Sequence, residues 1–204
     1  MKDDSRNINQ GDIFISLTDN EEYILDAINR GASKIICRSG NYDVPTINVP
    51  NPREYLANYL DNLYKDKFSD IKLIGITGTN GKTTSCYLLW QILNRLGYKC
   101  GYIGTIGFYI DDKIKDLDNT TPDMLSLYNM INECILNGCK YIVMEVSSQA
   151  LMFGRIGKLM FDYAIFTNLT IEHLDYHKTM ENYLKELRDM QLLILIQIII
   201  NTLC

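Results

Sequence analysis

Residues 75–84 carry the strongest chemical signal in the sequence. A strand-like apolar run is followed at once by the loop TGTNGKTT and then by an amphipathic helix. Glycines at positions 78 and 81 let successive backbone N–H groups point toward one anion, and the helix that follows adds its positive end. In such a loop Lys82 contacts the terminal phosphates of a nucleotide, and the Thr83 hydroxyl binds Mg²⁺.

The spacing of this loop departs from the strict pattern GxxxxGK[ST]. That pattern requires glycine at position 76, where the chain has Ile76, and Gly75 stands one residue earlier. We therefore interpret the segment as a variant phosphate loop. The alternative is a turn that only connects a strand to a helix.

Glu145 closes an apolar, strand-like run and is followed by Ser147 and Ser148. In an open parallel sheet, ligands bind beyond the carboxyl ends of the strands. A carboxylate at that edge can provide a second ligand for nucleotide-bound Mg²⁺. The alternative is a helix cap or a solvated side chain.

Further polar residues follow the same predicted sheet edge. His173 and His177 are four residues apart, a spacing that places both rings on one helical face, as in a two-histidine metal site. One histidine as a cation ligand and its neighbour as a packing residue is an equally good interpretation. The loop at 119–123 is either functional or a turn with a helix cap. Arg155 either binds an anionic substrate group or is simply exposed.

The apolar pattern predicts an α/β chain with mostly parallel strands, because strands and helices alternate. The first part is expected to hold strands at 12–17, 34–37 and 46–49, a helix at 21–29, and another helix from Arg53. The polar stretch 65–70 marks a boundary. The second part is expected to hold strands at 71–76, 102–106, 108–110, 141–145 and 163–166, a helix closed by Gly97, and a helix from an Asp123 cap to Asn137.

Composition excludes several classes of protein. The 204 residues include 20 basic and 25 acidic side chains, a net charge of −5, which disfavours a sequence-independent nucleic-acid binder. The six cysteines form no CxxC pair and the start has no signal-peptide pattern, so we expect free thiols in the cytoplasm. The apolar run 192–200 is too short for a membrane span of about 20 residues.

Four motifs occur together and in order: TGTNGKT at 77–83, NTTPD at 119–123, MEVSS at 144–148, and FTNL…HLDYH at 166–177. Together they resemble the Mur ligases, and among these the branch that adds the third amino acid to UDP-MurNAc-L-Ala-D-Glu. The resemblance extends over about residues 3–184. It implies a shortened N-terminal UDP-substrate-binding domain at 1–69, an incomplete P-loop-type ATP-binding domain at 70–188, and an aberrant apolar tail at 189–204.

The resemblance also implies roles for individual residues. ATP and Mg²⁺ are the implied cofactors, and the reaction is amide formation through an acyl phosphate, with UDP-MurNAc-dipeptide and an amino acid as substrates. The implied phosphate-binding residues are Gly78, Thr79, Asn80, Gly81, Lys82, Thr83 and Thr84. The implied catalytic residues are Lys82, Glu145 and His173, and the implied metal ligands are Thr83, Glu145 and His173. The implied substrate contacts are Ser5, Thr120, Thr121, Ser147 and Arg155.

The chain departs from the family pattern at several positions. Gln149 stands where the family carries histidine, Phe153 where a polar contact is common, and Leu187 where a lysine carbamate bridges the second Mg²⁺. Lys185 is a poor substitute for that lysine. Beyond Arg188 the resemblance ends in the apolar tail. We therefore expect a truncated or frameshifted ligase with impaired or no turnover.

Two alternatives remain open on the sequence. One is a nucleotide-binding fragment without catalysis, and the other is a related amide ligase that acts on a different polyamino-acid substrate. The uncharged run 192–200 has the composition of an aggregation-prone segment. We expect it to lower solubility or to pair with an open sheet edge, and deletion of residues 190–204 to improve solubility.

Overall fold

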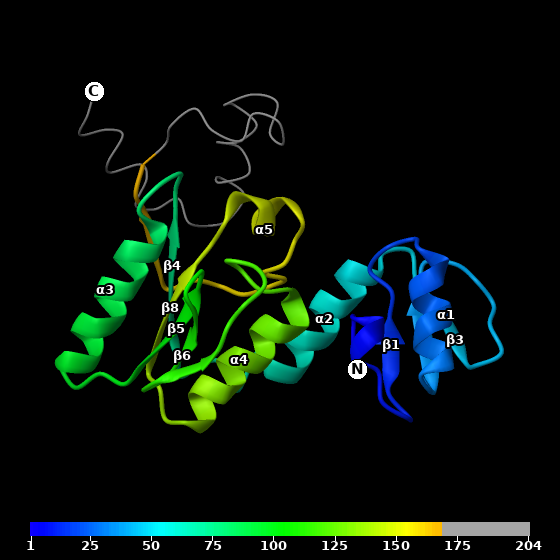
Figure 1. Cartoon of the computed structure of the whole chain (residues 1–204). Helices are drawn as coiled ribbons and strands as arrows, with labels where there is room; N and C mark the ends of the chain where they lie inside the picture. Colours follow the sequence, from blue (N-terminus) through cyan, green and yellow to red (C-terminus); the bar gives the residue numbers. More distant parts are fainter. Residues whose placement is uncertain (169–204) are drawn as a thin grey trace. The chain divides into compact units, whose positions relative to one another are not determined.

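The chain forms two compact units, and the computed structural model describes residues 1–168 (Figure 1). The first unit runs from Met1 to Leu63, and the second begins at Tyr64. The polar boundary expected at 65–70 lies just inside the second unit. Both units combine helices with parallel strands, which confirms the predicted α/β class. Among the described helices, none is long and apolar enough to cross a membrane.

The first unit is built on a parallel sheet with the strand order β1-β2-β3. Parallel neighbours cannot be joined by a tight hairpin, so longer connections, one of them a helix, separate the three apolar runs. The elements in chain order are η1 (Ser5–Asn7), β1 (Ile13–Ile15), α1 (Glu21–Asn29), β2 (Lys34–Cys37), β3 (Thr46–Asn48) and α2 (Pro52–Tyr64). The predicted helix at 21–29 and strand at 34–37 are confirmed at both ends.

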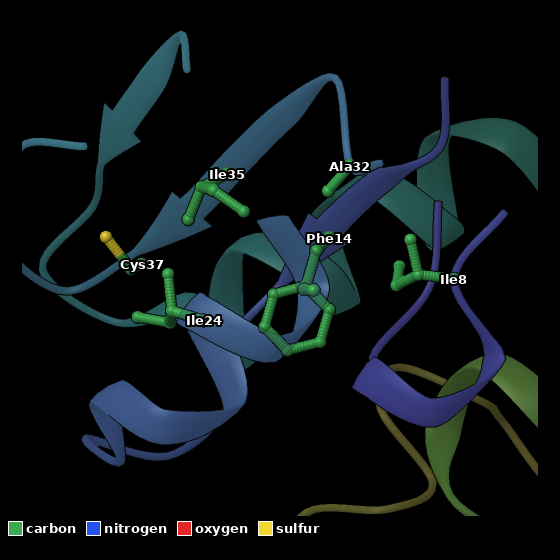
Figure 2. Packing of buried hydrophobic residues seen from close by; sticks show 7 residues of the cluster. Ile8, Phe14, Ile24, Ala32, Ile35 and Cys37 are labelled. Atoms are coloured by element: carbon green, nitrogen blue, oxygen red, sulfur yellow. The ribbon is translucent and has the colours of Figure 1, made fainter. Parts of the chain in front are cut away.

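The core of the first unit joins its sheet to α1 (Figure 2). Phe14 of β1 and Ile35 of β2 are register partners, and both are fully buried. From α1, Ile24 and Ala27 join the same cluster, since residues three apart lie on one face of a helix. Burial of each large side chain of this cluster contributes about 1.5–3 kcal/mol.

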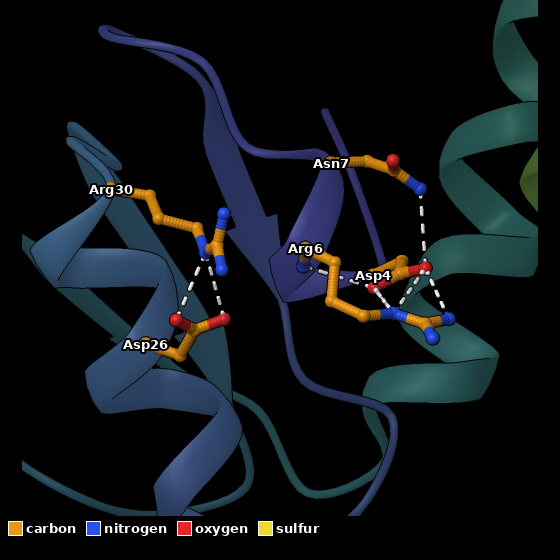
Figure 3. A network of polar contacts seen from close by, with 5 residues as sticks. All are labelled: Asp4, Arg6, Asn7, Asp26 and Arg30. Atoms are coloured by element: carbon orange, nitrogen blue, oxygen red, sulfur yellow. Dashed lines mark hydrogen bonds and ion pairs between the residues drawn. The ribbon is translucent and has the colours of Figure 1, made fainter.

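Two acidic side chains of the first unit are held by nearby arginines (Figure 3). Asp4 caps η1 by accepting the Arg6 N–H at 3.0 Å and also accepts the Arg6 side-chain Nε–H at 2.9 Å. Asp26 accepts the Arg30 Nε–H at 2.9 Å, one helical turn away. A hydrogen bond from the Ser5 hydroxyl, and then the bond from Arg30, lower the pKa of Asp26. Ser5 therefore has a polar partner within its own unit.

The second unit contains a sheet with the strand order β7-β6-β5-β8-β4-β9. Its elements are β4 (Lys72–Thr77), α3 (Lys82–Arg95), β5 (Cys100–Gly104), β6 (Gly107–Tyr109), β7 (Lys113–Lys115), α4 (Met124–Leu136), β8 (Tyr141–Glu145), α5 (Ser148–Met152) and β9 (Tyr163–Phe166). Strands β5, β8, β4 and β9 are parallel, so their carboxyl ends share one edge. Strands β6 and β7 extend the sheet in antiparallel pairing.

Helices α3 and α4 cover opposite faces of this sheet (Figure 1). Two successive residues of β5 demonstrate this coverage, because successive side chains of a strand point to opposite faces of the sheet. The Tyr102 ring lies 6.4 Å from the ring of Trp90 in α3, whereas a Cβ added at Gly101 would meet Sγ of Cys134 in α4. Coverage on both faces explains why β5 and β8 are almost continuously apolar.

The C-terminus of α3 is closed at the predicted glycine. Gly97 has a φ of +85°, a conformation that favours glycine. Its N–H donates to the Asn94 carbonyl at 3.0 Å, and the Tyr98 N–H donates to the Leu93 carbonyl at 2.9 Å. These two bonds form a Schellman motif, which satisfies the last carbonyls of the helix.

The N-terminus of α4 lies at the predicted cap residue, Asp123, but the side chain makes no capping hydrogen bond. The Asp123 carboxylate instead lies 3.2 Å from Nε of Arg155. A tertiary ion pair has therefore replaced the local cap that the sequence suggested.

Candidate functional site

The glycine loop lies between β4 and α3, at the carboxyl edge of the second sheet. Gly78 and Gly81 have φ values of +129° and +83°, which favour glycine. A Cβ at Gly78 would also collide with Thr167 and with the Asn168 backbone. Gly81 is the N-cap of α3 and has no side chain to occupy the first N–H groups of the helix. The loop therefore provides a backbone surface suited to phosphate.

Lys82 bends back over this loop. Its ammonium group donates to the Gly78 carbonyl at 2.7 Å and to the Thr79 carbonyl at 2.8 Å. These contacts place a positive charge beside the positive end of α3, and the two add to an attractive potential for an anion.

Strand β9 holds the loop in shape through the two residues that follow it. The Thr79 N–H donates to the Asn168 carbonyl at 2.9 Å, and the Asn80 N–H donates to Oδ1 of Asn168 at 3.0 Å. The Thr167 hydroxyl and the Asn168 side-chain amide both donate to the Asn80 carbonyl, at 2.6 and 3.1 Å. The FTNL motif thus holds the loop in place, a role that its sequence did not predict.

Glu145 lies at the end of β8 and is fully buried. Its Oε2 accepts a hydrogen bond from the Thr83 hydroxyl at 2.8 Å, which confirms that the two residues meet. The Tyr102 hydroxyl and the Thr105 N–H donate to Oε1, at 2.7 and 2.8 Å. A buried carboxylate requires such donors, because an unpaired buried charge is very costly.

The NTTPD loop meets the MEVSS segment at the same edge. The buried Thr121 hydroxyl donates to the Glu145 carbonyl at 2.9 Å and accepts the Ser147 N–H at 3.0 Å. Thr121 therefore braces the loop, and its hydroxyl is occupied by these backbone groups. Arg155 donates to the Thr121 carbonyl at 3.3 Å. The Thr120 hydroxyl lies 3.1 Å from that of Thr105.

A cavity of about 210 Å³ connects the two predicted groups of residues. It is lined by Gly78, Thr79, Lys82, Thr120, Ser147, Ser148 and Gln149. The expected phosphate-binding residues thus face the expected substrate contacts Thr120 and Ser147 across one small space. Gln149 lines it too.

Several predicted features lie outside the described residues. These are His173 as a catalytic residue and metal ligand, His177, Leu187, and the apolar tail at 189–204. Ser5 belongs to the first unit, whereas the cavity belongs to the second.

The oxygens of Thr83 and Glu145 suit a hard divalent cation, since Mg²⁺ prefers carboxylate and hydroxyl ligands and keeps several waters. Within residues 1–168, no group of three His, Cys, Asp or Glu side chains is gathered as a protein-only metal cage.

Sequence reasoning missed three residues beside Glu145, namely Tyr102, Gly104 and Thr105. A Cβ at Gly104 would collide with Oε1 of Glu145 and with the Tyr102 hydroxyl. The available signal was a glycine followed by threonine at the end of an apolar strand. That signal acquires meaning only because β5 lies next to β8 in the sheet.

The fold and site together define a phosphate-loop α/β domain, in which a glycine loop and an acidic strand end meet at the carboxyl edge of a parallel sheet. The Mur ligase middle domain family matches residues 76–193. The chain belongs to the Mur ligase family.

Curated relatives agree with this assignment. The chain is 43% identical over 190 residues to UDP-N-acetylmuramoyl-L-alanyl-D-glutamate--2,6-diaminopimelate ligase of Phocaeicola vulgatus, covering 89% of this chain and 39% of the relative. It is 42% identical over 190 residues to the ligase of the same name from Clostridium tetani, covering 88% and 39%. The chain thus spans about 39% of the length of these relatives.

Solved structures share the fold. A structure of UDP-N-acetylmuramoyl-L-alanyl-D-glutamate--2,6-diaminopimelate ligase matches with a TM-score of 0.75 and 28% identity, over 91% of this chain and 39% of that one. MurF ligase from Thermotoga maritima, in complex with ADP, matches with a TM-score of 0.60 and 19% identity, over 90% and 40%. At that identity the second likeness supports the fold alone.

Proposed function

We propose that this chain carries the ATP-binding part of a ligase that adds the third amino acid to UDP-MurNAc-L-Ala-D-Glu in peptidoglycan precursor synthesis. The single observation that carries the proposal is the meeting of Thr83 with Glu145 at 2.8 Å, beside the loop over which Lys82 lies. The names of the relatives supply the dipeptide substrate, and they give diaminopimelate as the first amino acid to test. We also propose that the protein is located in the cytoplasm, as expected from the sequence.

The proposed roles of the two parts of the chain rest on the same curated relatives. Residues 70–188 act as the ATP-binding domain, and residues 1–69 as a shortened UDP-substrate-binding domain. Ser5, Thr120, Ser147 and Arg155 are proposed substrate contacts, with Thr121 as the buried brace of its loop.

The proposed reaction has two steps. A substrate carboxylate oxygen attacks the γ-phosphorus of ATP, the bond to the bridging oxygen breaks, and ADP leaves an acyl phosphate. The amine of the incoming amino acid then attacks the acyl carbon, phosphate leaves, and the amine proton passes to solvent. Lys82 and the N–H groups at the start of α3 hold the phosphate oxygens and offset the repulsion between the two anions that must meet.

The residues of this chain that would hold Mg²⁺ are Thr83 and Glu145, with His173 as a further proposed ligand. The ion, when bound, would neutralise negative charge on the phosphates. Glu145 is held for this task by its hydrogen bonds, and Thr83 is fixed by the first turn of α3.

Calorimetric titration of the purified chain with Mg-ATP tests nucleotide binding. We expect saturable binding that is weakened at least tenfold in Lys82→Ala, because a charge-assisted hydrogen bond contributes about 1.5–3 kcal/mol. Lys140→Ala, which removes an exposed lysine of the second unit, is the matched control and should bind like the wild type. Equal binding by wild type and Lys82→Ala would contradict the proposal.

Ligation is tested separately by phosphate release with ATP, UDP-MurNAc-dipeptide and diaminopimelate. Release that depends on all three substrates would support the complete reaction in this chain. Specific nucleotide binding without release would favour the nucleotide-binding alternative. Release with a different acceptor, and none with UDP-MurNAc-dipeptide, would favour a related amide ligase.

A further inference from the structure

The two oxygens of the buried Glu145 carboxylate accept hydrogen bonds from different donor groups. Oε1 accepts hydrogen bonds from the Tyr102 hydroxyl at 2.7 Å and from the Thr105 N–H at 2.8 Å. Oε2 accepts from the Thr83 hydroxyl at 2.8 Å and from the Thr105 hydroxyl at 3.2 Å. The carboxylate is therefore held on one side by β5 and the residue after it, and its other oxygen meets the first turn of α3.

The Tyr102 hydroxyl is itself fixed in place. Its ring is fully buried and lies edge-on to the rings of Tyr87, at 6.1 Å, and of Tyr109, at 5.7 Å. The hydroxyl of this buried ring donates to Oε1 of Glu145 at 2.7 Å. Gly104 leaves the space in which the hydroxyl and the carboxylate meet, since a Cβ there would collide with both.

A carboxylate without such donors can rotate and present either oxygen. Two donors on Oε1 remove that freedom before any ligand arrives, and a preorganised ligand binds more tightly because less ordering is needed. Neither donor on Oε1 comes from the glycine loop, so this restraint is independent of Lys82.

We propose that Tyr102 is a positioning residue of the nucleotide site, which engages Oε1 of Glu145 and so directs Oε2 toward Thr83 as a ready pair of oxygen ligands for Mg²⁺. Gly104 is the residue that permits this contact. The inference rests on the proposed function, because it assigns Mg²⁺-dependent nucleotide binding to the site.

The test measures binding of the non-hydrolysable ATP analogue AMP-PNP to the full chain by calorimetry, at a series of free Mg²⁺ concentrations and in EDTA. In Tyr102→Phe, we expect the Mg²⁺ concentration for half-maximal binding to rise about tenfold, from the loss of one hydrogen bond to a buried charge. Binding in EDTA should stay within about twofold of the wild type, because Lys82 and the loop are unchanged.

Tyr109→Phe is the matched control. It removes a hydroxyl from the same group of rings, but that hydroxyl donates to the Ile106 carbonyl and not to Glu145. Gly104→Ala is a second variant that disturbs the same contact through an added Cβ, and it should shift the Mg²⁺ dependence in the same direction. Circular dichroism and thermal unfolding identify which variants are folded, and either folded variant suffices for the test.

The outcomes separate the two proposals. A wild type that binds no nucleotide overturns the proposed function, and this inference with it. Mg²⁺-dependent binding by the wild type, with the same dependence in the folded variants, overturns the role of Tyr102 alone. Equal weakening with Mg²⁺ and in EDTA would show a general structural effect, and would also overturn it.

Discussion

The backbone oxygen of Asn168 accepts the Thr79 N–H at 2.9 Å, while the side chain of the same residue accepts the Asn80 N–H at 3.0 Å. One residue after β9 thus holds two neighbouring N–H groups of the glycine loop. A glycine-containing loop has high conformational freedom, and anion binding must otherwise restrain it. The first N–H groups of α3 have no partner within the helix and are suited to meet a phosphate.

Asn168→Ala should therefore weaken nucleotide binding without removing any expected phosphate contact. The variant loses the bonds to the Asn80 N–H and carbonyl, and we expect binding to weaken about fivefold to tenfold, or about 1–1.4 kcal/mol. Calorimetric titration with Mg-ATP measures it. Asn137→Ala, at the end of α4, is the matched control, because its side-chain amide donates to the Glu133 carbonyl of that helix. Unchanged affinity in Asn168→Ala would show that the loop keeps its shape without this brace.

Much of this site could be predicted, because its chemistry is concentrated in short segments. Lys82 and Thr83 follow directly from a strand, a glycine loop and a helix, and Glu145 follows from a charge that ends an apolar strand. The strand at 163–166 and that at 141–145 were predicted at both ends.

The residues that sequence reasoning missed depend on tertiary neighbours. In the sequence, Tyr102 is an ordinary strand residue. Its contact with Glu145 arises only because β5 pairs with β8. Strand β7 (Lys113–Lys115) is exposed throughout and has a single apolar residue, Ile114, which is too short a pattern to predict a strand. Asp123 is the N-cap residue of α4 as predicted, but its carboxylate pairs with Arg155, 32 residues later in the sequence, and makes no capping hydrogen bond.

The first unit should show a pH dependence of stability that originates at Asp26. Its pKa is lowered in the folded state by the Ser5 hydroxyl and then by Arg30, so the folded state favours the carboxylate. The contribution is fully present above the ordinary value of 3.8 and is lost as pH falls through the lowered pKa. Asp26→Asn should therefore be less stable than the wild type at pH 7, and the difference should close in acid.

Hydrogen exchange followed by mass spectrometry measures this effect in peptides from α1, with both proteins compared at each pH. Ser5→Ala should give a smaller loss at pH 7 than Asp26→Asn, because Arg30 still holds the carboxylate. A difference between wild type and Asp26→Asn that does not begin to shrink as the pH falls below 3.8 would contradict the assignment.

Thr77, the residue at which β4 meets the loop, should respond to substitution in the opposite way from most buried residues. Its hydroxyl is buried and has no hydrogen-bond partner among the described residues. An unsatisfied buried hydroxyl costs about 1–3 kcal/mol, and valine has nearly the same shape without it. We expect Thr77→Val to raise the free energy of unfolding by about 1 kcal/mol and the melting temperature by about 2–4 °C.

Thr121→Val is the matched control, because it makes the same chemical change at an equally buried threonine whose hydroxyl is satisfied. That hydroxyl bonds to the Glu145 carbonyl and the Ser147 N–H, so its loss leaves both backbone groups without that partner. We expect Thr121→Val to lower the free energy of unfolding by about 1–3 kcal/mol. Urea unfolding, followed by fluorescence of the single Trp90, measures both variants in the second unit. Two changes of the same sign would mean that hydrogen bonding of the hydroxyl does not decide stability at these positions.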